Sequence, residues 1–171
     1  MRKIVSGFAS SVDGYIEGPN GEYDWILINK EMDFQEQMKR YDTFLYGRLT
    51  YERTLTMKGA LARGARHYVF SHTLEEVENP FKLIKGDFKE KILHMKQQPG
   101  KDIAVFGGAI LLASLLDIQL VDELSIAVIP VLLGSGKPMV DILNSRIPLN
   151  LRETKTYSNG TVQLTYDIAY P

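Results

Sequence analysis

The chain has 171 residues, of which 44% are hydrophobic and 24% charged, as expected for a single domain with a buried core. Its net charge is -1, so no charge excess favours binding to nucleic acid or to an anionic membrane. Cysteine is absent, which excludes disulfides and thiolate catalysis, and the three histidines lack the spacing of a helical metal site. The N-terminal residues lack the apolar core of a secretory signal. We therefore expect one cytoplasmic domain over residues 1–171, without a metal site.

The first part of the chain predicts a strand, a turn and a helix. Residues 4–9 are apolar enough for a buried strand, and Asp13 with Gly14 follows as a turn. Asn29 is the candidate N-cap of a helix that extends to Arg40, with acidic residues in the first turn and basic residues in the last, as the helix dipole favours. The apolar stripe of this helix consists of Phe34, Met38 and Tyr41.

Next along the chain, residues 43–46 form a short β-prone run that ends at Gly47, and residues 49–56 are typical of a helix directly behind it. Residues 67–71 predict another strand. Asp87 is the candidate N-cap of a helix that ends before a Pro-Gly pair. The apolar face of that helix consists of Phe88, Ile92 and Met95.

The same order of strand, glycine and helix occurs a second time. Residues 103–106 predict a buried strand, Gly107 and Gly108 follow, and residues 109–116 predict a helix that is apolar almost all round. The chain therefore contains two junctions at which a strand passes through glycine into a helix.

The last third is β-rich. Residues 124–131 predict a strand, and residues 149–156 and 161–168 predict a hairpin around Asn159-Gly160, since Asn-Gly is a strong hairpin signal. Apolar and polar residues alternate strictly in the last strand, as in a half-buried antiparallel strand. Together the elements predict an α/β sheet, mostly parallel, that is closed by a C-terminal antiparallel hairpin.

Two such junctions place two helix N-termini near one carboxyl edge of a parallel sheet, where anions bind. Gly47 is followed by Arg48 and Thr50, which can both contact phosphate, whereas Gly107 and Gly108 offer bare backbone. Each glycine alone is more typical of a structural turn, and Thr50 of a helix cap. Together the junctions favour a dinucleotide.

Ser71 and His72 follow the strand of residues 67–71 and would lie at the same edge of the sheet. They are typical either of a turn at the end of a strand or of contacts with a phosphate or a ribose. Together with Arg48 they suit a 2′-phosphate, which favours NADPH over NADH.

Five segments carry a family resemblance. They are Ser11-Val12-Asp13-Gly14-Tyr15-Ile16, Gly47-Arg48-Leu49-Thr50-Tyr51-Glu52, Phe106-Gly107-Gly108-Ala109, Val121-Asp122-Glu123-Leu124 and Pro130-Val131-Leu132-Leu133-Gly134-Ser135-Gly136-Lys137-Pro138. In this order they resemble the dihydrofolate reductase-like superfamily, and specifically stand-alone proteins similar to the reductase domain of the bacterial bifunctional riboflavin deaminase-reductase.

The resemblance implies a three-layer α/β/α fold around a mixed sheet, with NADPH across its carboxyl edge. It implies that Gly47, Arg48 and Thr50 hold cofactor phosphates, that Ser71 and His72 face the adenosine 2′-phosphate, and that Gly107, Gly108, Ala109 and Ile110 wrap the pyrophosphate and ribose. Because related reductase domains dimerise, we expect a homodimer with residues 124–131 near its interface.

The substrate side departs from the family pattern. Phe106 stands where the riboflavin-pathway reductases usually have a glutamate, and residues 35–40 replace the arginine-rich helix that holds the ribose phosphate. Asp13 is a candidate catalytic acid or a turn former. Glu31 is a candidate for the acid that contacts the pterin in dihydrofolate reductases, or a partner of the helix dipole, as Asp33 is.

Two aromatic residues are candidates for substrate binding. Trp25 offers a flat wall against a heterocycle or packs in the core, and Tyr15 adds ring surface. The run Gly134-Ser135-Gly136-Lys137 is typical of a turn, because it lacks the spacing and context of a phosphate-binding loop.

The resulting hypothesis is an NADPH-dependent reductase that transfers a hydride to a small heterocyclic, imine or carbonyl acceptor. It resembles 5-amino-6-(5-phosphoribosylamino)uracil reductase of riboflavin biosynthesis. The alternatives are a non-catalytic dinucleotide-binding protein and a dihydrofolate reductase acting on a pterin. A flavodoxin-like domain is disfavoured by the C-terminal hairpin.

Overall fold

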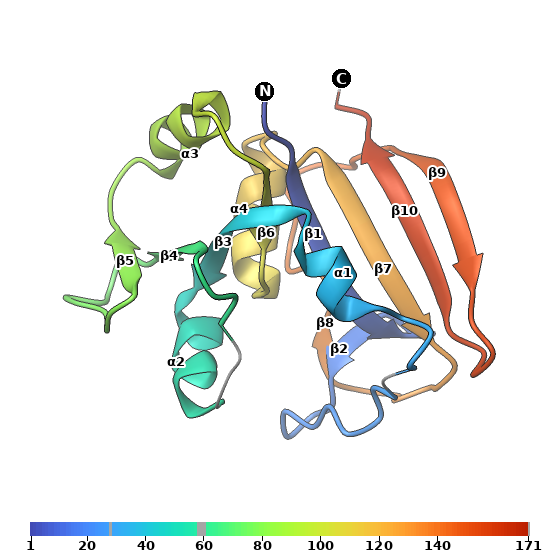
Figure 1. The fold of residues 1–171 in the computed structure, drawn as a ribbon. Helices are drawn as coiled ribbons and strands as arrows, with labels where there is room; N and C mark the ends of the chain where they lie inside the picture. The colour runs from blue at the N-terminus through green and yellow to red at the C-terminus, as the bar shows by residue number, and fades with distance from the viewer. Residues whose placement is uncertain (28, 58–60, 171) are drawn as a thin grey trace.

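A single large sheet organises the molecule in the computed structural model, which describes residues 1–27, 29–57 and 61–170 (Figure 1). Its strand order is β5-β4-β3-β6-β1-β7-β10-β9. The strands are β1 (Ile4–Ser11), β3 (Tyr41–Gly47), β4 (Arg66–Phe70), β5 (Phe81–Ile84), β6 (Asp102–Val105), β7 (Glu123–Ile129), β9 (Leu149–Thr156) and β10 (Val162–Ile168). A separate pair joins β2 (Tyr15–Glu17) to β8 (Lys137–Pro138). The helices are α1 (Phe34–Met38), α2 (Arg48–Thr56), α3 (Phe88–Gln97) and α4 (Ala109–Asp117).

The six strands from β5 to β7 run parallel, and β10 pairs antiparallel with both β7 and β9. Neighbouring residues of β3 point to opposite faces, so Leu45 joins one apolar core with α3 and α4, and Phe44 joins another with α2. Met38 of α1 packs against this second core. The predicted fold is thus confirmed as a three-layer arrangement around a mixed, mostly parallel sheet.

The predicted start of the first helix is wrong. The Oδ1 atom of Asn29 accepts a hydrogen bond from Glu31 N at 2.9 Å, which closes a local turn instead of capping a helix. Asp33 is the N-cap, since its Oδ1 accepts from Glu36 N at 2.9 Å. The helix is therefore only five residues long, and Tyr41 of the predicted stripe already belongs to β3.

The C-terminal hairpin forms as predicted, with Gly160 at a φ of 85° in its turn. The predicted burial alternation of β10 is wrong, because Thr165 is buried while its apolar neighbours are only partly covered. A register shift against β9 occurs between Thr165 and Tyr166. The short strands β2, β5 and β8 were not predicted.

Strand β7 offers no free edge, because β1 and β10 flank it on both sides. The free edge at this end of the sheet belongs to β9, all of whose residues are exposed. Within the part of the chain that the structure describes, none of the helices combines the length and hydrophobicity needed to cross a bilayer.

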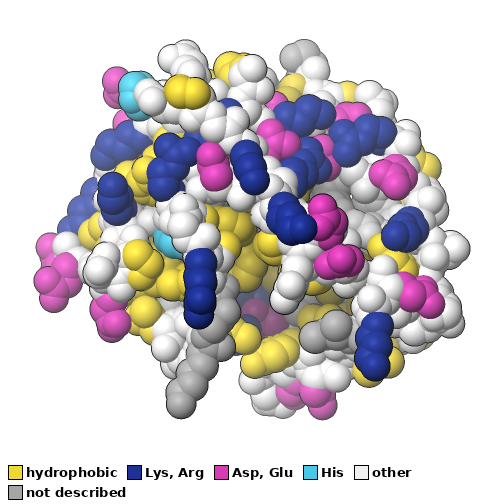
Figure 2. Space-filling view, in the orientation of Figure 1, with side chains coloured by type: hydrophobic (Ala, Val, Ile, Leu, Met, Phe, Trp, Pro, Cys, Tyr) yellow, Lys and Arg dark blue, Asp and Glu magenta, His cyan; other side chains and the backbone are white. Residues whose placement is uncertain are grey.

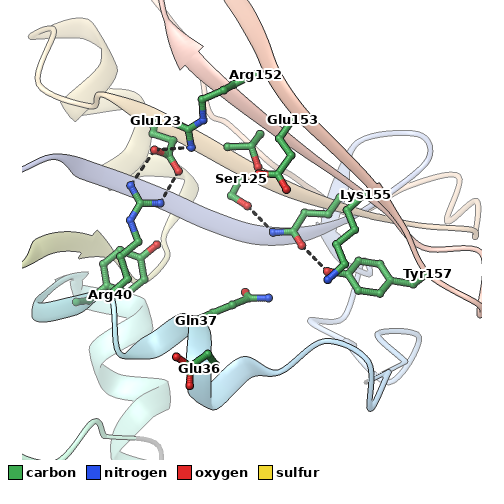
Figure 3. Close-up of a pocket in the computed structure, with 12 residues that line it drawn as sticks. Glu36, Gln37, Arg40, Glu123, Ser125, Arg152, Glu153, Lys155 and Tyr157 are labelled. Atoms are coloured by element: carbon green, nitrogen blue, oxygen red, sulfur yellow. Dashed lines mark hydrogen bonds and ion pairs between the residues drawn. The ribbon is translucent and has the colours of Figure 1, made fainter.

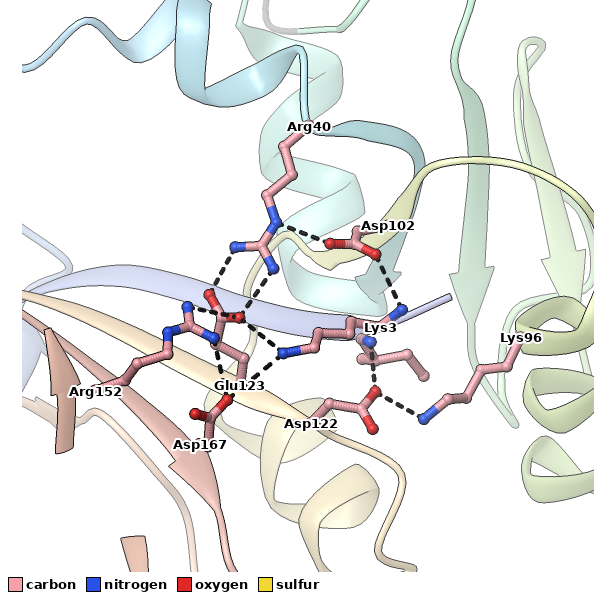
Figure 4. Close-up of polar contacts among 9 residues, drawn as sticks. Lys3, Arg40, Lys96, Asp102, Asp122, Glu123, Arg152 and Asp167 are labelled. Atoms are coloured by element: carbon pink, nitrogen blue, oxygen red, sulfur yellow. Dashed lines mark hydrogen bonds and ion pairs between the residues drawn. The ribbon is translucent and has the colours of Figure 1, made fainter. Parts of the chain in front are cut away.

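An ionic network lies at the N-terminal edge of the sheet, where the parallel strands β1, β6 and β7 begin (Figure 4). Glu123 is only 1% exposed, and its carboxylate binds Arg40 in a bidentate pair at 2.6 and 2.8 Å and Arg152 at 2.9 Å. Burial opposes ionisation of Glu123, but the hydrogen bonds and charges of the two arginines hold its pKa below the usual value. Arg40 also binds Asp102 at 2.8 Å, which fixes the chain between α1 and β3 onto the sheet.

Candidate active site

The two predicted junctions of strand, glycine and helix meet at the carboxyl edge of the sheet. A Cβ built on Gly108 would lie 3.5 Å from Thr50 Oγ1 and 3.9 Å from the Cα atom of Gly47. Gly107 and Gly108 have φ angles of 105° and 99°, a conformation that favours glycine. Neither α2 nor α4 has a side-chain hydrogen bond at its N-cap. Both helices therefore present first-turn N–H groups that a ligand can use.

A cavity of about 260 Å³, which we call the junction cavity, lies at this meeting point. Its lining residues are Gly47, Arg48, Leu49, Thr50, Phe70, Ser71, His72, Thr73, Phe88, Gly108, Ala109, Ile110, Leu111, Ser114 and Lys137. The lining thus includes every residue that was predicted to bind the cofactor, except Gly107. Gly107 is next to the cavity, because a Cβ built on it would lie 3.4 Å from Thr50 Cγ2.

The Ser71–His72 pair both shapes a turn and faces the junction cavity. Ser71 Oγ accepts hydrogen bonds from Thr73 N at 3.2 Å and Leu74 N at 3.1 Å, which is the turn role considered from the sequence. The His72 ring stacks on Phe88 with the ring centroids 4.6 Å apart. This stacking holds the imidazole against the wall of the cavity.

Lys137 is a residue of the junction cavity that sequence reasoning missed. The pairing of β8 with β2 brings it there, and its Nζ lies 3.7 Å from Glu17 Oε1. The same carboxylate binds Arg53 of α2 at 2.7 Å. The loop before Lys137 is a turn, as predicted, and a Cβ on Gly136 would meet Glu17 O at 2.1 Å. The only sequence signal was a lysine after a glycine-rich turn.

A second cavity of about 300 Å³, the apolar cavity, lies on the face of the sheet that carries α1. Figure 2 shows apolar side chains in a hollow at the centre of this face. The lining residues are Val5, Gly7, Phe8, Ala9, Ile26, Leu27, Met32, Phe34, Gln37, Met38, Tyr41, Ala104, Val105, Phe106, Ser125, Ala127, Ile129 and Gln163. Among these described residues Tyr41 is the only titratable group. Burial raises the pKa of Tyr41, so its phenol keeps its proton at neutral pH.

Comparison with known proteins agrees with this architecture. The family model described as RibD C-terminal domain matches residues 2–163. The chain belongs to the RibD C-terminal domain family.

One relative and two solved structures are similar to this RibD C-terminal domain over nearly its whole length. YyaP of Bacillus subtilis (strain 168), described as uncharacterized, is 36% identical over 97% of this chain and 95% of its own length. A crystal structure from Shewanella sp. PV-4, provisionally assigned to riboflavin biosynthesis, is 26% identical with a TM-score of 0.87, covering 98% of this chain and 99% of its own. Dihydrofolate reductase from Enterococcus faecalis, complexed with NADP(H), shares the fold with a TM-score of 0.72 at 17% identity, covering 97% of this chain and 96% of its own.

In this RibD C-terminal domain the two candidate catalytic carboxylates line neither of these cavities. Asp13 accepts hydrogen bonds from Gly134 N at 2.7 Å and Leu133 N at 3.1 Å. A hydrogen bond with Ser11, aided by these backbone N–H groups, lowers the pKa of Asp13 to about 2. The Glu31 carboxylate accepts hydrogen bonds from Ser158 Oγ at 2.6 Å and Ser158 N at 3.2 Å, and these bonds lower the pKa of Glu31. Both carboxylates tie loops together.

The two candidate substrate-binding aromatics also lie outside these cavities. Trp25 is half-buried, and its Nε1 donates to Glu22 O at 3.1 Å within the loop that precedes α1. Tyr15 opens β2 and pairs with Pro138. The apolar cavity is lined instead by Phe106 and by the stripe residues Phe34, Met38 and Tyr41, together with residues that the sequence did not single out, among them Phe8, Met32 and Ala127.

Proposed function

We propose that this protein is an NADPH-dependent reductase that transfers a hydride to a small heterocyclic, imine or carbonyl acceptor. The observation that carries the proposal is that the segment of residues 106–108 contacts both the apolar cavity and the junction cavity. Phe106 lines the apolar cavity, and Gly108, two residues later, lines the junction cavity. A cofactor in one cavity can therefore reach an acceptor in the other. The family assignment and the fold shared with an NADP(H)-binding dihydrofolate reductase support this reading.

The residues of the junction cavity fit a dinucleotide phosphate. The uncapped N-termini of α2 and α4 present N–H groups, and the two glycines before α4 leave room for a phosphate beside the backbone. Arg48 and Lys137 supply positive charge, each with one acidic partner, Glu52 at 2.9 Å for Arg48 and Glu17 at 3.7 Å for Lys137. His72 with Ser71 would face the 2′-phosphate. Gly108, Ala109 and Ile110 would wrap the pyrophosphate and ribose.

Bound NADPH supplies the hydride, and the residues of this chain supply position and protection. The aliphatic and aromatic walls of the apolar cavity exclude water and hold a flat ring. The hydroxyl groups of Tyr41 and Ser125 and the amides of Gln37 and Gln163 are its polar groups. They can orient an acceptor by hydrogen bonds, and a proton then arrives through such a hydroxyl or through a water next to it.

The pterin alternative finds less support than an acceptor that needs no carboxylate partner. Among the described residues of the apolar cavity there is no carboxylate that could bind a pterin ring. Asp33 is committed to capping α1, and Glu31 to Ser158. We therefore favour a neutral ring or a conjugated carbonyl over dihydrofolate.

Steady-state oxidation of NADPH, followed by absorbance, tests the proposal. The acceptor panel comprises ribosylated and phosphoribosylated aminouracils, cyclic imines, conjugated carbonyls and dihydrofolate. We expect turnover above the blank for at least one neutral acceptor. NADPH binding without turnover of any acceptor would favour the non-catalytic alternative, and absence of NADPH binding at high micromolar concentration would overturn the proposal.

The proposed enzyme is a homodimer. The exposed strand β9 gives the sheet a free edge, on which Leu149 and Leu151 are 38% and 58% exposed. Such an edge pairs readily with another chain. Light scattering at several concentrations tests this part, and the mass of a monomer at every concentration would contradict it.

A further inference from the structure

A third cavity of about 280 Å³ adjoins the apolar cavity near the N-terminal edge of the sheet (Figure 3). We call it the polar cavity. Its lining residues are Glu36, Gln37, Arg40, Tyr41, Glu123, Ser125, Arg152, Glu153, Lys155, Tyr157, Gln163 and Thr165. Four of these residues also line the apolar cavity, namely Gln37, Tyr41, Ser125 and Gln163. The two cavities are therefore neighbouring compartments that share a wall of hydrogen-bonding side chains.

Two side chains of this shared wall, Ser125 and Gln163, are held by a chain of hydrogen bonds. The phenol of Tyr157 donates to Gln163 Oε1 at 2.7 Å, and Gln163 Nε2 donates to Ser125 Oγ at 2.9 Å (Figure 3). Because Ser125 Oγ accepts this bond, its own hydroxyl proton is available, and no acceptor for it occurs among the described residues. Ser125 thus offers a hydrogen-bond donor at the boundary between the two compartments.

The positive charges of the polar cavity are already compensated. Arg40 and Arg152 both bind the buried carboxylate of Glu123 (Figures 3 and 4). Each arginine has a further acidic partner, Asp102 at 2.8 Å for Arg40 and Asp167 at 3.0 Å for Arg152. The charges of both guanidinium groups are therefore balanced by acidic partners within the protein, which weakens their attraction for a phosphate.

The remaining charges do not attract a dianion either. Lys155 lies 4.9 Å above the ring of Tyr157, and the carboxylates of Glu36, which pairs with Lys39, and of Glu153 line the same cavity. The lining thus carries three basic and three acidic side chains, whose formal charges cancel. A phosphate that entered would lose hydration without gaining net attraction. An uncharged group with several hydroxyl or amide functions would keep its hydrogen bonds.

We propose that the polar cavity holds an uncharged, hydrogen-bonding arm of the hydride acceptor, such as a sugar or an amide, while the ring occupies the apolar cavity. This inference rests on the proposed reductase function and specifies its substrate class as a substituted heterocycle without phosphate. Glu123 contributes most to this specificity, because its buried carboxylate is the counter-charge that Arg40 and Arg152 share.

A matched pair of ligands tests the inference. Calorimetry measures binding of a ribosylaminouracil and of its 5′-phosphate to the protein saturated with NADP⁺, after binding of NADPH itself has been measured. We expect the unphosphorylated compound to bind at least about tenfold more tightly. Tighter binding of the phosphate, or binding of neither compound to a protein that binds NADPH, overturns the inference alone. Failure to bind NADPH overturns the proposed function instead.

Charge variants test why the cavity discriminates. In Glu123→Gln the two guanidinium groups lose their shared counter-charge, so the ratio of the two affinities should shift about tenfold toward the phosphate. Because Glu123 is buried, its variant is first checked for a cooperative thermal transition.

Glu153→Gln removes one acidic group from an exposed position of the same cavity and should shift the ratio about threefold in the same direction. Glu75→Gln, at an exposed carboxylate that lines none of the three cavities, should leave the ratio unchanged. An unchanged ratio in a folded Glu153→Gln protein contradicts the charge argument.

Discussion

The junction cavity and the apolar cavity are built in different ways. The junction cavity is formed largely by three short segments, residues 47–50, 70–73 and 108–111, whose backbone conformation creates the binding surface. The apolar cavity takes its walls one to three residues at a time from elements spread over residues 5–163. A surface made by local backbone is encoded in short motifs, whereas a surface made by distant side chains depends on the whole fold.

We expect the largest loss of NADPH affinity from a variant that distorts the backbone of the junction cavity. In Gly108→Ala an L side chain must adopt a φ near 99°, which costs about 1–2 kcal/mol, or the junction must rearrange. We expect NADPH to bind about 100-fold more weakly, because the N–H groups of α4 lose their alignment. Fluorescence titration measures the loss.

Gly86→Ala is the matched control for this variant. Gly86 has a φ of 81°, nothing lies within 4 Å of its Cβ position, and it is outside the junction cavity. It should lose a similar amount of stability with unchanged NADPH affinity. Equal affinities of the two variants would show that the junction does not bind the cofactor.

We expect the second-largest effect, a loss of kcat/KM, from a variant whose side chain fills the apolar cavity. Ala127→Leu adds bulk to a wall made of side chains, so we expect kcat/KM for the acceptor to fall about 30-fold while NADPH affinity stays within about threefold. Ala169→Leu makes the same change outside these cavities and should have little effect on either quantity. A parallel loss of NADPH affinity and turnover in Ala127→Leu would contradict the separation of the two cavities.

A smaller effect concerns charge in the junction cavity. Arg48→Gln should lower the preference for NADPH over NADH about tenfold, because a charge-assisted contact to phosphate is lost. Lys137→Gln should weaken binding of NADPH by a similar factor. The control is Arg146→Gln, at an exposed arginine outside the cavity. Unchanged dinucleotide preference in Arg48→Gln would remove this residue from the binding site.

The smallest effect concerns the histidine that is buried in the core. His67 is 3% exposed, donates from Nε2 to Ala62 O and accepts from the phenol of Tyr46 at Nδ1. Burial lowers the pKa of His67 below 6.5, so below pH 6.5 the unfolded chain binds a proton that the folded chain does not. The free energy of unfolding should therefore fall as pH decreases from 6.5, by at most about 1.4 kcal/mol per pH unit.

Urea denaturation at pH 7.5, 6.5 and 5.5 measures this dependence. His67→Gln should flatten it over this range, whereas His94→Gln, at an exposed histidine, should retain it. If wild-type protein and His67→Gln show the same slope, the buried histidine is not the source of the pH dependence.

The contrast between the cavities also describes what the sequence could predict. Asp87 was recognised as an N-cap because its bonds to Lys89 N and Glu90 N are local. Asn29 was misassigned, because it and Asp33 are both good N-cap residues and both accept a hydrogen bond from a nearby backbone N–H. Lys137 was missed because a strand pairing more than a hundred residues apart in sequence brings it to the junction cavity.

The central claim is that one dinucleotide spans the junction cavity and reaches the apolar cavity at Phe106. A crystal structure of the protein soaked with NADPH tests it most directly. We predict phosphates against Gly47–Arg48 and Gly108–Ala109, a 2′-phosphate facing His72, and the nicotinamide at the mouth of the apolar cavity. A cofactor bound elsewhere, or a nicotinamide that points away from Phe106, would contradict the claim.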